Sequence, residues 1–408
     1  MIEDVHRREW ASLVASLARR FGLDVAEEAA SEAFLAAVEH WRGGVPANPG
    51  GWLMTTASRK AIDRVRRDGR REQKYAAAAV LGTTYLTEDS AMREPGEEEH
   101  GSALDDDRLR LMFTCCHPAL SPGARVSLTL RLVGGLTVEQ IARGLLQSEA
   151  AVAQRITRAK AKIASAHIPY RVPEAAELPE RVDAVLSVLY LIFNEGYLPG
   201  GDQPLRPDLT AEGVRLARLL GALLPQSHEA SGLLALMLLS EARRSSRISA
   251  DGELVTLAEQ DRGSWDRVLI DEGHAIVRGL IASGEPPGRY QLEAAISAVH
   301  TYAGDVRDTD WEQLSKLYDH LFAVLPTPVV ALNRAVVRAE LDGPAVALAE
   351  VERLELADYH AWQVVRADLL RRLGRSAEAR SAYDAAISLA VNPAEIRHLQ
   401  RRRASVAR

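Results

Sequence analysis

Cysteine, long apolar runs and strand-like alternating patterns are scarce in this chain of 408 residues. The two cysteines are neighbours, Cys115 and Cys116, which excludes a disulfide framework and is typical of a reducing compartment. No apolar N-terminal run resembles a signal peptide, and no stretch of about 20 apolar residues could cross a bilayer. We therefore expect a cytoplasmic protein with no membrane partner.

An excess of positive charge is also missing. The chain has 50 Lys and Arg against 56 Asp and Glu, a formal net charge of −6. The whole chain thus lacks the charge signature of a polyanion-binding protein, and any DNA contact must come from local basic patches. Because Ala, Leu, Arg and Glu dominate and alternating patterns are rare, the sequence predicts an all-α fold. Its length allows two or three domains.

Residues 136–163 have the pattern of a helix-turn-helix. Thr137 and Gln140 can form a capping box for a first short helix, and Ser148 can cap the second. The second helix has an apolar face made of Val152, Ile156, Ala159 and Ile163. Its other face is polar and basic, with Gln154, Arg155, Arg158, Lys160 and Lys162. Such a helix enters the major groove, so we predict that Gln154, Arg155, Arg158 and Lys162 contact DNA. Amphipathic helices with a basic rim also occur in proteins that do not bind DNA.

A second basic segment, 59–74, holds eight basic and three acidic residues. Ala61, Ile62 and Val65 supply its predicted apolar face. Trp52 precedes it, as either a core anchor or a platform for unstacked bases. A charge run can also be a solvated helix face. The DNA-binding residues predicted for this part of the chain are Trp52, Arg59, Lys60, Arg64, Arg66, Arg67, Arg70 and Arg71.

Composition divides the chain into four zones. Residues 1–75 are a helical domain, in which an amphipathic helix at 26–34 has an acidic face that is either solvated or made for a basic partner protein. Residues 76–107 form an acidic linker, either a solvated spacer or a mimic of DNA that shields a basic surface. Residues 108–168 hold the helix-turn-helix, and residues 169–408 are a helical extension.

The order of an acidic helix, Trp52-Leu53, a basic helix, a linker and a helix-turn-helix resembles regions 2 and 4 of extracytoplasmic-function sigma factors of the sigma-70 family. Residues 107–120, 193–197 and 290–296 resemble the subgroup with a long C-terminal extension of tetratricopeptide type. This resemblance covers essentially the whole chain. It implies no enzyme activity, no catalytic residue and no cofactor.

The resemblance also implies partners and roles by position. Glu28, Glu32 and Phe34 match the helix that grips the β′ clamp helices of RNA polymerase, whose core, with its β and β′ subunits, is the expected partner. Residues 52–71 match the part that melts and reads the −10 element of promoter DNA. Gln154, Arg155 and Arg158 match the helix that reads the −35 element.

Three positions depart from the family pattern. Ser31 stands where many relatives have Gln, and Arg59 where many have Asn. Leu146 stands at the usual glycine of the turn between the two DNA-reading helices, and Gly144 lies two positions earlier. The first two departures bear on the contact residues, and the third bears on the geometry of the turn.

The extension has tetratricopeptide-like repeats, clearest at 329–392. Residues 373–389 fit the repeat pattern, and Ala345 lies 34 residues before Ala379, which is the period of that class. Stacked helix pairs usually bind peptides or other proteins, so we expect either a protein partner there or a purely structural extension. The hypothesis is that the repeats regulate the chain in cis.

The remaining polar clusters are predicted to have structural roles and not to form a catalytic or metal site. Adjacent helical side chains diverge by about 100°, so Cys115, Cys116 and His117 are not expected to hold a metal. The polar residues at 194–197, 259–262 and 265–266 are expected to make helix-end and interhelix contacts. Two other functions remain open: a stand-alone helix-turn-helix regulator with a repeat-type sensor domain, and a repeat-based scaffold.

Overall fold

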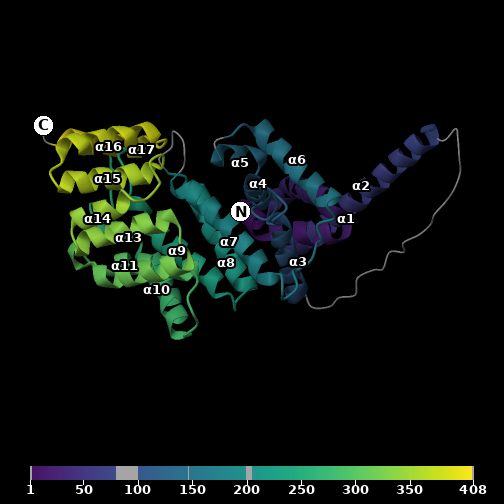
Figure 1. The fold of residues 1–408 in the computed structure, drawn as a ribbon. Helices are drawn as coiled ribbons and strands as arrows, with labels where there is room; N and C mark the ends of the chain where they lie inside the picture. Colours follow the sequence, from purple (N-terminus) through teal and green to yellow (C-terminus); the bar gives the residue numbers. More distant parts are fainter. Residues whose placement is uncertain (1, 80–99, 146, 199–204, 407–408) are drawn as a thin grey trace. The chain divides into compact units, whose positions relative to one another are not determined.

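The computed structural model describes residues 2–79, 100–145, 147–198 and 205–406, which belong to two compact units, residues 1–188 and 189–408 (Figure 1). The prediction of an all-α fold is confirmed: the described residues form helices and no β-strand. An isolated antiparallel bridge joins Ile248 to Leu254. The boundary between the units falls inside a helix, later in the chain than the predicted start of the extension at 169.

The first unit contains a helix pair at its N-terminus, then the helix-turn-helix. Its helices are α1 (Ile2–His40), α2 (Pro49–Ala79), α3 (His100–Cys115), α4 (Pro122–Leu132), α5 (Val138–Gly144), α6 (Glu149–Ser165) and the start of α7 (Leu178–Tyr197). The 3-10 turn η1 (Trp41–Gly43) joins α1 to α2. The helices α2, α3 and α4 all pack against α1.

A kink at Gly22 divides α1 into two parts. Gly22 has φ 79° and ψ 166°, a backbone conformation that is open essentially to glycine alone. Residues 23–40, which carry the predicted acidic face, therefore run in a different direction from residues 2–21. This kink places the acidic part of α1 between α2 and the helix-turn-helix.

The indole of Trp10 fixes α1 against α4. Its side chain is 2% exposed, and Nε1 donates to the carbonyl oxygens of Arg131 at 3.2 Å and Leu132 at 3.1 Å. Gly135 lies so near that a Cβ there would come within 2.9 Å of the indole. Tyr170 adds a second link, because its hydroxyl donates to the Ala15 carbonyl oxygen at 2.8 Å.

The predicted acidic linker ends earlier than residue 107. Helix α3 begins at His100, and the Asp107 side chain is buried. Its carboxylate accepts from Arg110 Nη1 at 2.8 Å and lies 3.5 Å from Ser16 Oγ. Because both partners belong to the folded unit, Asp107 is part of the packed structure and not of a solvated spacer. Residues 80–99 lie outside the described part of the chain.

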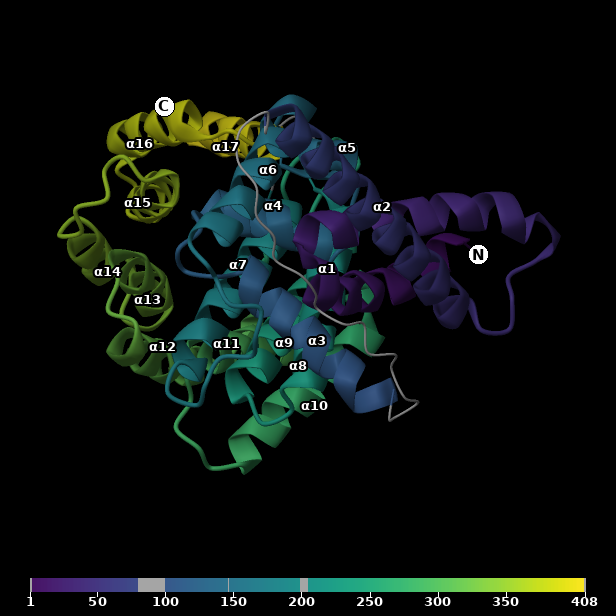
Figure 2. The ribbon, with the colours of Figure 1, turned by 90° about the vertical axis from the view of Figure 1, so that its right-hand side faces the viewer.

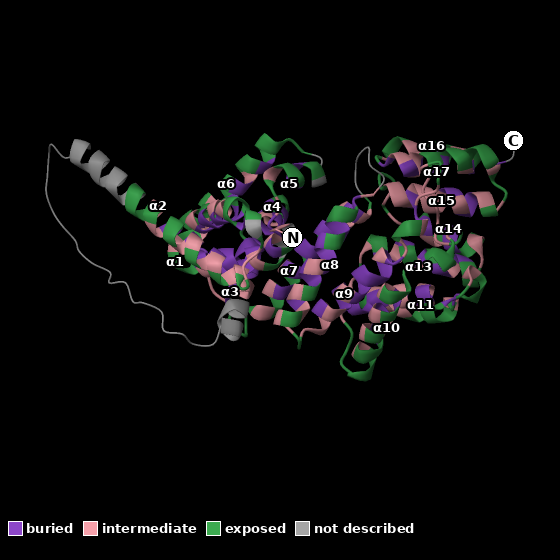
Figure 3. Cartoon of the chain, turned by 180° about the vertical axis from the view of Figure 1, so that it is seen from behind, coloured by how far each residue is buried: buried purple, intermediate pink, exposed green. Residues whose placement is uncertain are grey.

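The described residues of the second unit are helical, and its first helices gather around α9. Its further helices are α8 (Pro207–Leu223), α9 (His228–Glu241), α10 (Arg267–Ala282), α11 (Arg289–Tyr302), α12 (Trp311–Val324), α13 (Pro328–Leu341), α14 (Pro344–Val351), α15 (His360–Arg372), α16 (Ser376–Leu389) and α17 (Pro393–Ser405). Buried residues crowd α9, which packs on α8, α10 and α11 (Figure 3). Gly232 permits the contact with α11, since a Cβ there would lie 2.7 Å from the Gln291 nitrogen.

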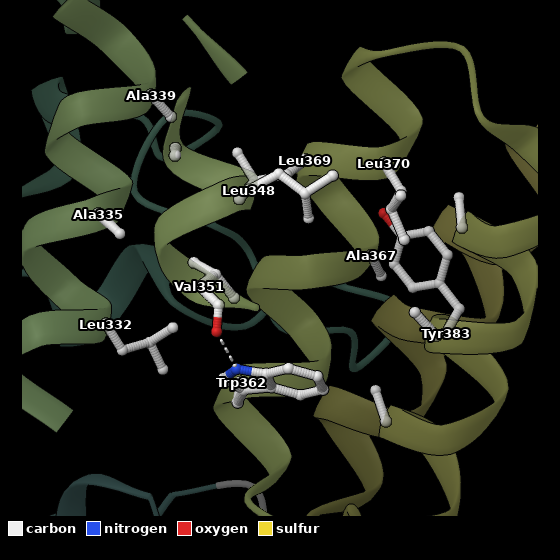
Figure 4. Packing of buried hydrophobic residues seen from close by; sticks show 14 of the residues in the cluster. Leu332, Ala335, Ala339, Leu348, Val351, Trp362, Ala367, Leu369, Leu370 and Tyr383 are labelled. Atoms are coloured by element: carbon white, nitrogen blue, oxygen red, sulfur yellow. Dashed lines mark hydrogen bonds between the residues drawn. The ribbon is translucent and has the colours of Figure 1, made fainter. Parts of the chain in front are cut away.

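The last helices of the second unit form successive pairs, α13 with α14 and α15 with α16, which follow one another in Figure 2. Trp362 joins the pairs, because its Nε1 donates to the Val351 carbonyl oxygen at 2.8 Å (Figure 4).

The predicted register of these repeats is wrong. Pro344 and Ser376 begin corresponding helices, so the buried Ala347 is the counterpart of the buried Ala379, while Ala345 is exposed. The physical reason is that the position three residues after each helix start is buried, at Ala347 in α14 and at Ala379 in α16, whereas the position of Ala345 is not. Repeated helix pairs are present, and their membership of the tetratricopeptide class stays a prediction.

Candidate nucleic-acid interface

Both predicted helix caps of the helix-turn-helix are confirmed. Thr137 and Gln140 cap α5 reciprocally: the Gln140 nitrogen donates to Thr137 Oγ1 at 3.1 Å, and the Thr137 nitrogen to Gln140 Oε1 at 2.8 Å. Ser148 Oγ accepts from the Ala151 nitrogen at 3.2 Å and caps α6. Leu146, the departure in the turn, lies outside the described residues.

Helix α6 divides into a buried and an exposed face. The predicted apolar residues are its buried ones: Val152, Ile156, Ala159 and Ile163. On the other face Gln154, Arg158 and Lys162 are exposed. The helix therefore presents an amide and two positive charges to solvent, the groups that hydrogen-bond to base edges and phosphates in a major groove.

Arg155 is placed differently from its three predicted companions. Its side chain is half-buried, and Nη1 donates to Gln147 Oε1 at 2.6 Å and lies 3.4 Å from Ser127 Oγ. Ser127 belongs to α4, while Gln147 precedes α6. The guanidinium thus links parts of the helix-turn-helix to one another, and its contact with DNA stays a prediction.

Lys160 is the residue of α6 whose environment the sequence did not reveal. Its ammonium pairs with Asp24 at 2.9 Å and with Glu27, and its side chain is only 10% exposed. The spacing could have indicated its burial, since Lys160 follows Val152 and Ile156 at intervals of four residues and so lies on the buried side of α6. What the spacing could not show is that α1 supplies carboxylates at that point.

Helix α2 begins with a cap and a buried row. Asn48 Oδ1 accepts from the Gly51 nitrogen at 2.9 Å, and the Leu53, Ala57 and Ala61 side chains are fully buried. The prediction that Val65 completes this face is wrong, because Val65 is 47% exposed. Val65 follows the buried Ala61 by four residues, so the buried row of α2 ends between these two positions.

The predicted DNA-binding residues of α2 fall into three groups. Arg59, Arg66 and Arg67 are exposed. Lys60 pairs with Glu32 at 3.3 Å, and Arg64 pairs with Glu28. The side chains of Arg70 and Arg71 lie outside the described part of the structure. Two residues predicted to bind DNA are therefore paired with two predicted to bind polymerase.

The two aromatic residues of the predicted interface have different surroundings. Trp52 is half-buried and packs edge-to-face on Trp41, with ring centroids 5.3 Å apart, so part of its ring stays accessible. Phe34 is only 7% exposed and packs on His6, with centroids 4.6 Å apart. Phe34 therefore belongs to the core, where it orients α1, and it does not form part of an exposed contact surface. Its partner lies near the chain start, a long-range contact that a local pattern cannot show.

The polar clusters set aside in the sequence have structural roles. Burial raises the pKa of the Cys116 thiol to about 11, and both cysteines are fully covered. Asp261 and Asp266 cap helices, and Arg243 Nη2 lies 3.3 Å from the Tyr197 hydroxyl.

Within the described ranges, no group of three or more His, Cys, Asp or Glu side chains is arranged to hold a metal. Among the helices described, none is long and apolar enough to cross a membrane.

Comparison with known proteins agrees with this geometry. The family described as Sigma-70 region 2 matches residues 7–71, which contain most of α1 and α2 as far as Arg71. The family described as Sigma-70, region 4 matches residues 110–163, which contain α4, α5 and nearly all of α6. An ECF RNA polymerase sigma factor, SigK, of Mycobacterium ulcerans (strain Agy99) is 30% identical over 152 residues, covering 35% of this chain and 72% of SigK. The chain belongs to the sigma-70 family.

This sigma-70 family member also has a third matched segment. Residues 181–280 match a family of unknown function (DUF6596). This segment contains α8, α9 and nearly all of α10. An uncharacterized protein of Rhizobium meliloti (strain 1021) is 42% identical over 392 residues, 95% of this chain and 91% of that protein. The whole arrangement of regions 2 and 4 with the helical extension is thus shared with a relative. No solved structure matches the chain.

Proposed function

We propose that this sigma-70 family member is an extracytoplasmic-function sigma factor, which binds core RNA polymerase in the cytoplasm and directs it to specific promoters. The observation that carries the proposal is the presence of region 2 and region 4 in one chain, each with basic side chains exposed on one helix. The name of the related SigK supports the same subgroup. The chain has no catalytic role in this account, and it needs no cofactor.

In this function α6 enters the major groove of the −35 element. Gln154 and Arg158 are exposed on one face and reach base edges, and Lys162 contacts a phosphate. Arg155 shapes the motif and supports these contacts. Because the basic groups displace counterions from DNA, promoter affinity should fall steeply as salt rises.

Helix α2 meets the −10 element. Arg59, Arg66 and Arg67 are exposed for the phosphates, and the accessible part of Trp52 stacks on an unpaired base. Lys60 and Arg64 join them once they leave Glu32 and Glu28. These exposed ion pairs are worth about 0–1 kcal/mol each, so a polyanion can compete for them.

Core polymerase binds the acidic part of α1. Glu28 and Glu32 present carboxylates to the β′ subunit, and Phe34 holds the helix in place from the interior.

The helix pairs from α13 to α16 offer an elongated surface of the kind that binds proteins, and they regulate transcription in cis or through a protein partner.

The test is run-off transcription by core polymerase from a promoter that depends on the full-length chain. Arg158→Ala should reduce the transcript by about 5-fold or more, since a lost base contact costs about 1–3 kcal/mol. Arg143→Ala is the matched control: Arg143 is exposed on α5 of the same motif and pairs with Glu139 at 2.6 Å. Equal transcript from Arg158→Ala and from the unaltered chain would contradict the role of α6.

A further inference from the structure

A cavity lies along α11 in the second unit, between α10 and α12. Its volume is about 720 Å³, and all three helices line it. The main contacts of α10 are with α9 and α11, and those of α12 are with α11 and α13 (Figure 2). The two outer helices therefore form walls, and α11 forms the floor. We name this cavity the α11 groove.

The floor of the α11 groove is an apolar face of one helix. Leu292, Ala295 and Val299 line it, and they recur at intervals of three and four residues. Val277 of α10 and Leu317 of α12 add apolar side chains from the two walls. The groove thus has the composition of a binding site, because such sites are concave and mostly apolar.

The α11 groove is long, and large side chains are exposed beside it. Gln291 and Tyr302 both line it, and they are 11 residues apart on α11, about 16 Å along the helix axis. Ile281 is 71% exposed and Tyr302 is 84% exposed, and both line the groove. Exposed apolar surface beside a groove is typical of a site that another protein covers. A small molecule fills only part of such a groove, whereas a helix of three turns spans it.

Carboxylates lie at both ends of the α11 groove. Glu285 follows the end of α10, close to the start of α11, while Asp308 and Asp310 precede α12, close to the end of α11. Apart from histidines, the other charged side chain among the described lining residues is Arg278. Three carboxylates against one guanidinium complement a partner that has basic side chains at both ends of an apolar segment.

We propose that the α11 groove is a docking site for an amphipathic helix of another protein. The occupant has apolar side chains at positions i, i+3 or i+4, and i+7, with Lys or Arg near each end. The apolar side chains fill the groove and cover Ile281 and Tyr302, and the basic ones pair with Glu285 and Asp308. This site goes beyond the proposed function, because its occupation requires neither DNA nor polymerase. Its residues are also distinct from the helix pairs α13 to α16.

The experiment selects partners from a phage-displayed library of random peptides, with the purified full-length chain as the target. Each peptide is long enough for about four helical turns. Enriched peptides should share the apolar spacing of an amphipathic helix and carry Lys or Arg near both ends. The most enriched peptide is then synthesised, and fluorescence anisotropy measures its Kd. Ile281→Ala and Tyr302→Ala should each raise Kd about 5-fold or more, as expected for anchoring side chains of an interface.

Further variants test the charges and the location. A chain with both Glu285→Gln and Asp308→Asn should raise Kd about 2-fold or more at low salt and flatten its dependence on salt. Val268→Ala and Glu312→Gln are the matched controls: both residues are exposed, on α10 and α12, and lie outside the groove. The controls should leave Kd unchanged. Because all these side chains are exposed, every variant should keep the Tm of the unaltered chain.

A selection that enriches no amphipathic pattern would overturn the proposal. So would an enriched peptide that binds Ile281→Ala and Tyr302→Ala as tightly as the unaltered chain, because it then binds elsewhere. Self-association of the full-length chain that Ile281→Ala abolishes would show that a second copy fills the groove, and the proposed partner would be wrong. None of these outcomes bears on the proposed function, which the transcription assay tests separately.

Discussion

Arg155→Ala separates the two roles that sequence and structure give to Arg155. The guanidinium donates to Gln147 at 2.6 Å and reaches Ser127 at 3.4 Å. Each hydrogen bond contributes about 0.5–1.5 kcal/mol, and the longer one lies at the low end. The variant should therefore lower the free energy of unfolding of the first unit by about 1–2 kcal/mol. In a unit of about 190 residues this corresponds to a fall in Tm of about 2–8 °C.

Calorimetry of the full-length chain provides the assay. Arg158→Ala is the control, because the Arg158 side chain is exposed on the same helix and its loss should change stability by less than about 0.5 kcal/mol. We expect Arg155→Ala to lower Tm and reduce transcription, and Arg158→Ala to reduce transcription alone. If the first unit of Arg155→Ala unfolds at the temperature of the unaltered chain, Arg155 does not stabilise the motif and the reasoning is refuted.

Three further predictions concern the rest of the chain. Gly22→Ala should destabilise the first unit by about 1–3 kcal/mol, because φ is 79° there; denaturant unfolding measures this, and an unchanged midpoint argues against the kink. Burial, with the charges of Arg243 and Arg262, lowers the pKa of His300 to about 4. Because the unfolded chain takes up the proton at higher pH than the folded chain, the free energy of unfolding should fall as pH drops from 6.5 towards 4. A His300→Gln variant with an equally steep pH dependence would show that His300 is not the cause. Trp362→Ala should lower the free energy of unfolding of the second unit by about 3–5 kcal/mol. It should also change the amount of transcript from the promoter while core polymerase stays bound, and an unchanged amount of transcript contradicts regulation by the helix pairs.

Local features of the first unit could be predicted from the sequence because their causes are local. The capping box at Thr137 and the cap at Ser148 need only residues three positions away. The buried face of α6 follows from helical spacing alone. The same holds for the all-α fold, which composition and periodicity determine together.

Long-range contacts account for what the sequence did not reveal. Phe34 resembles a surface residue of an amphipathic helix, and its burial depends on His6 and on the kink at Gly22. Lys160 resembles a DNA contact until α1 brings Asp24 and Glu27 to it. Ala345 has the expected spacing from Ala379, but the start of α14 at Pro344 makes Ala347 its structural counterpart.

The most direct test of the central claim is transcription by core polymerase on a pool of genomic promoter fragments, with and without the full-length chain, followed by sequencing of the RNA start sites. We predict a set of start sites that appears only with the chain, shares −10 and −35 sequences and is used about 5-fold less or weaker still with Arg158→Ala. The contradicting result is a set of start sites that is the same with and without the chain. Tight, sequence-specific binding of the polymerase-free chain to duplex DNA would then identify a stand-alone regulator instead.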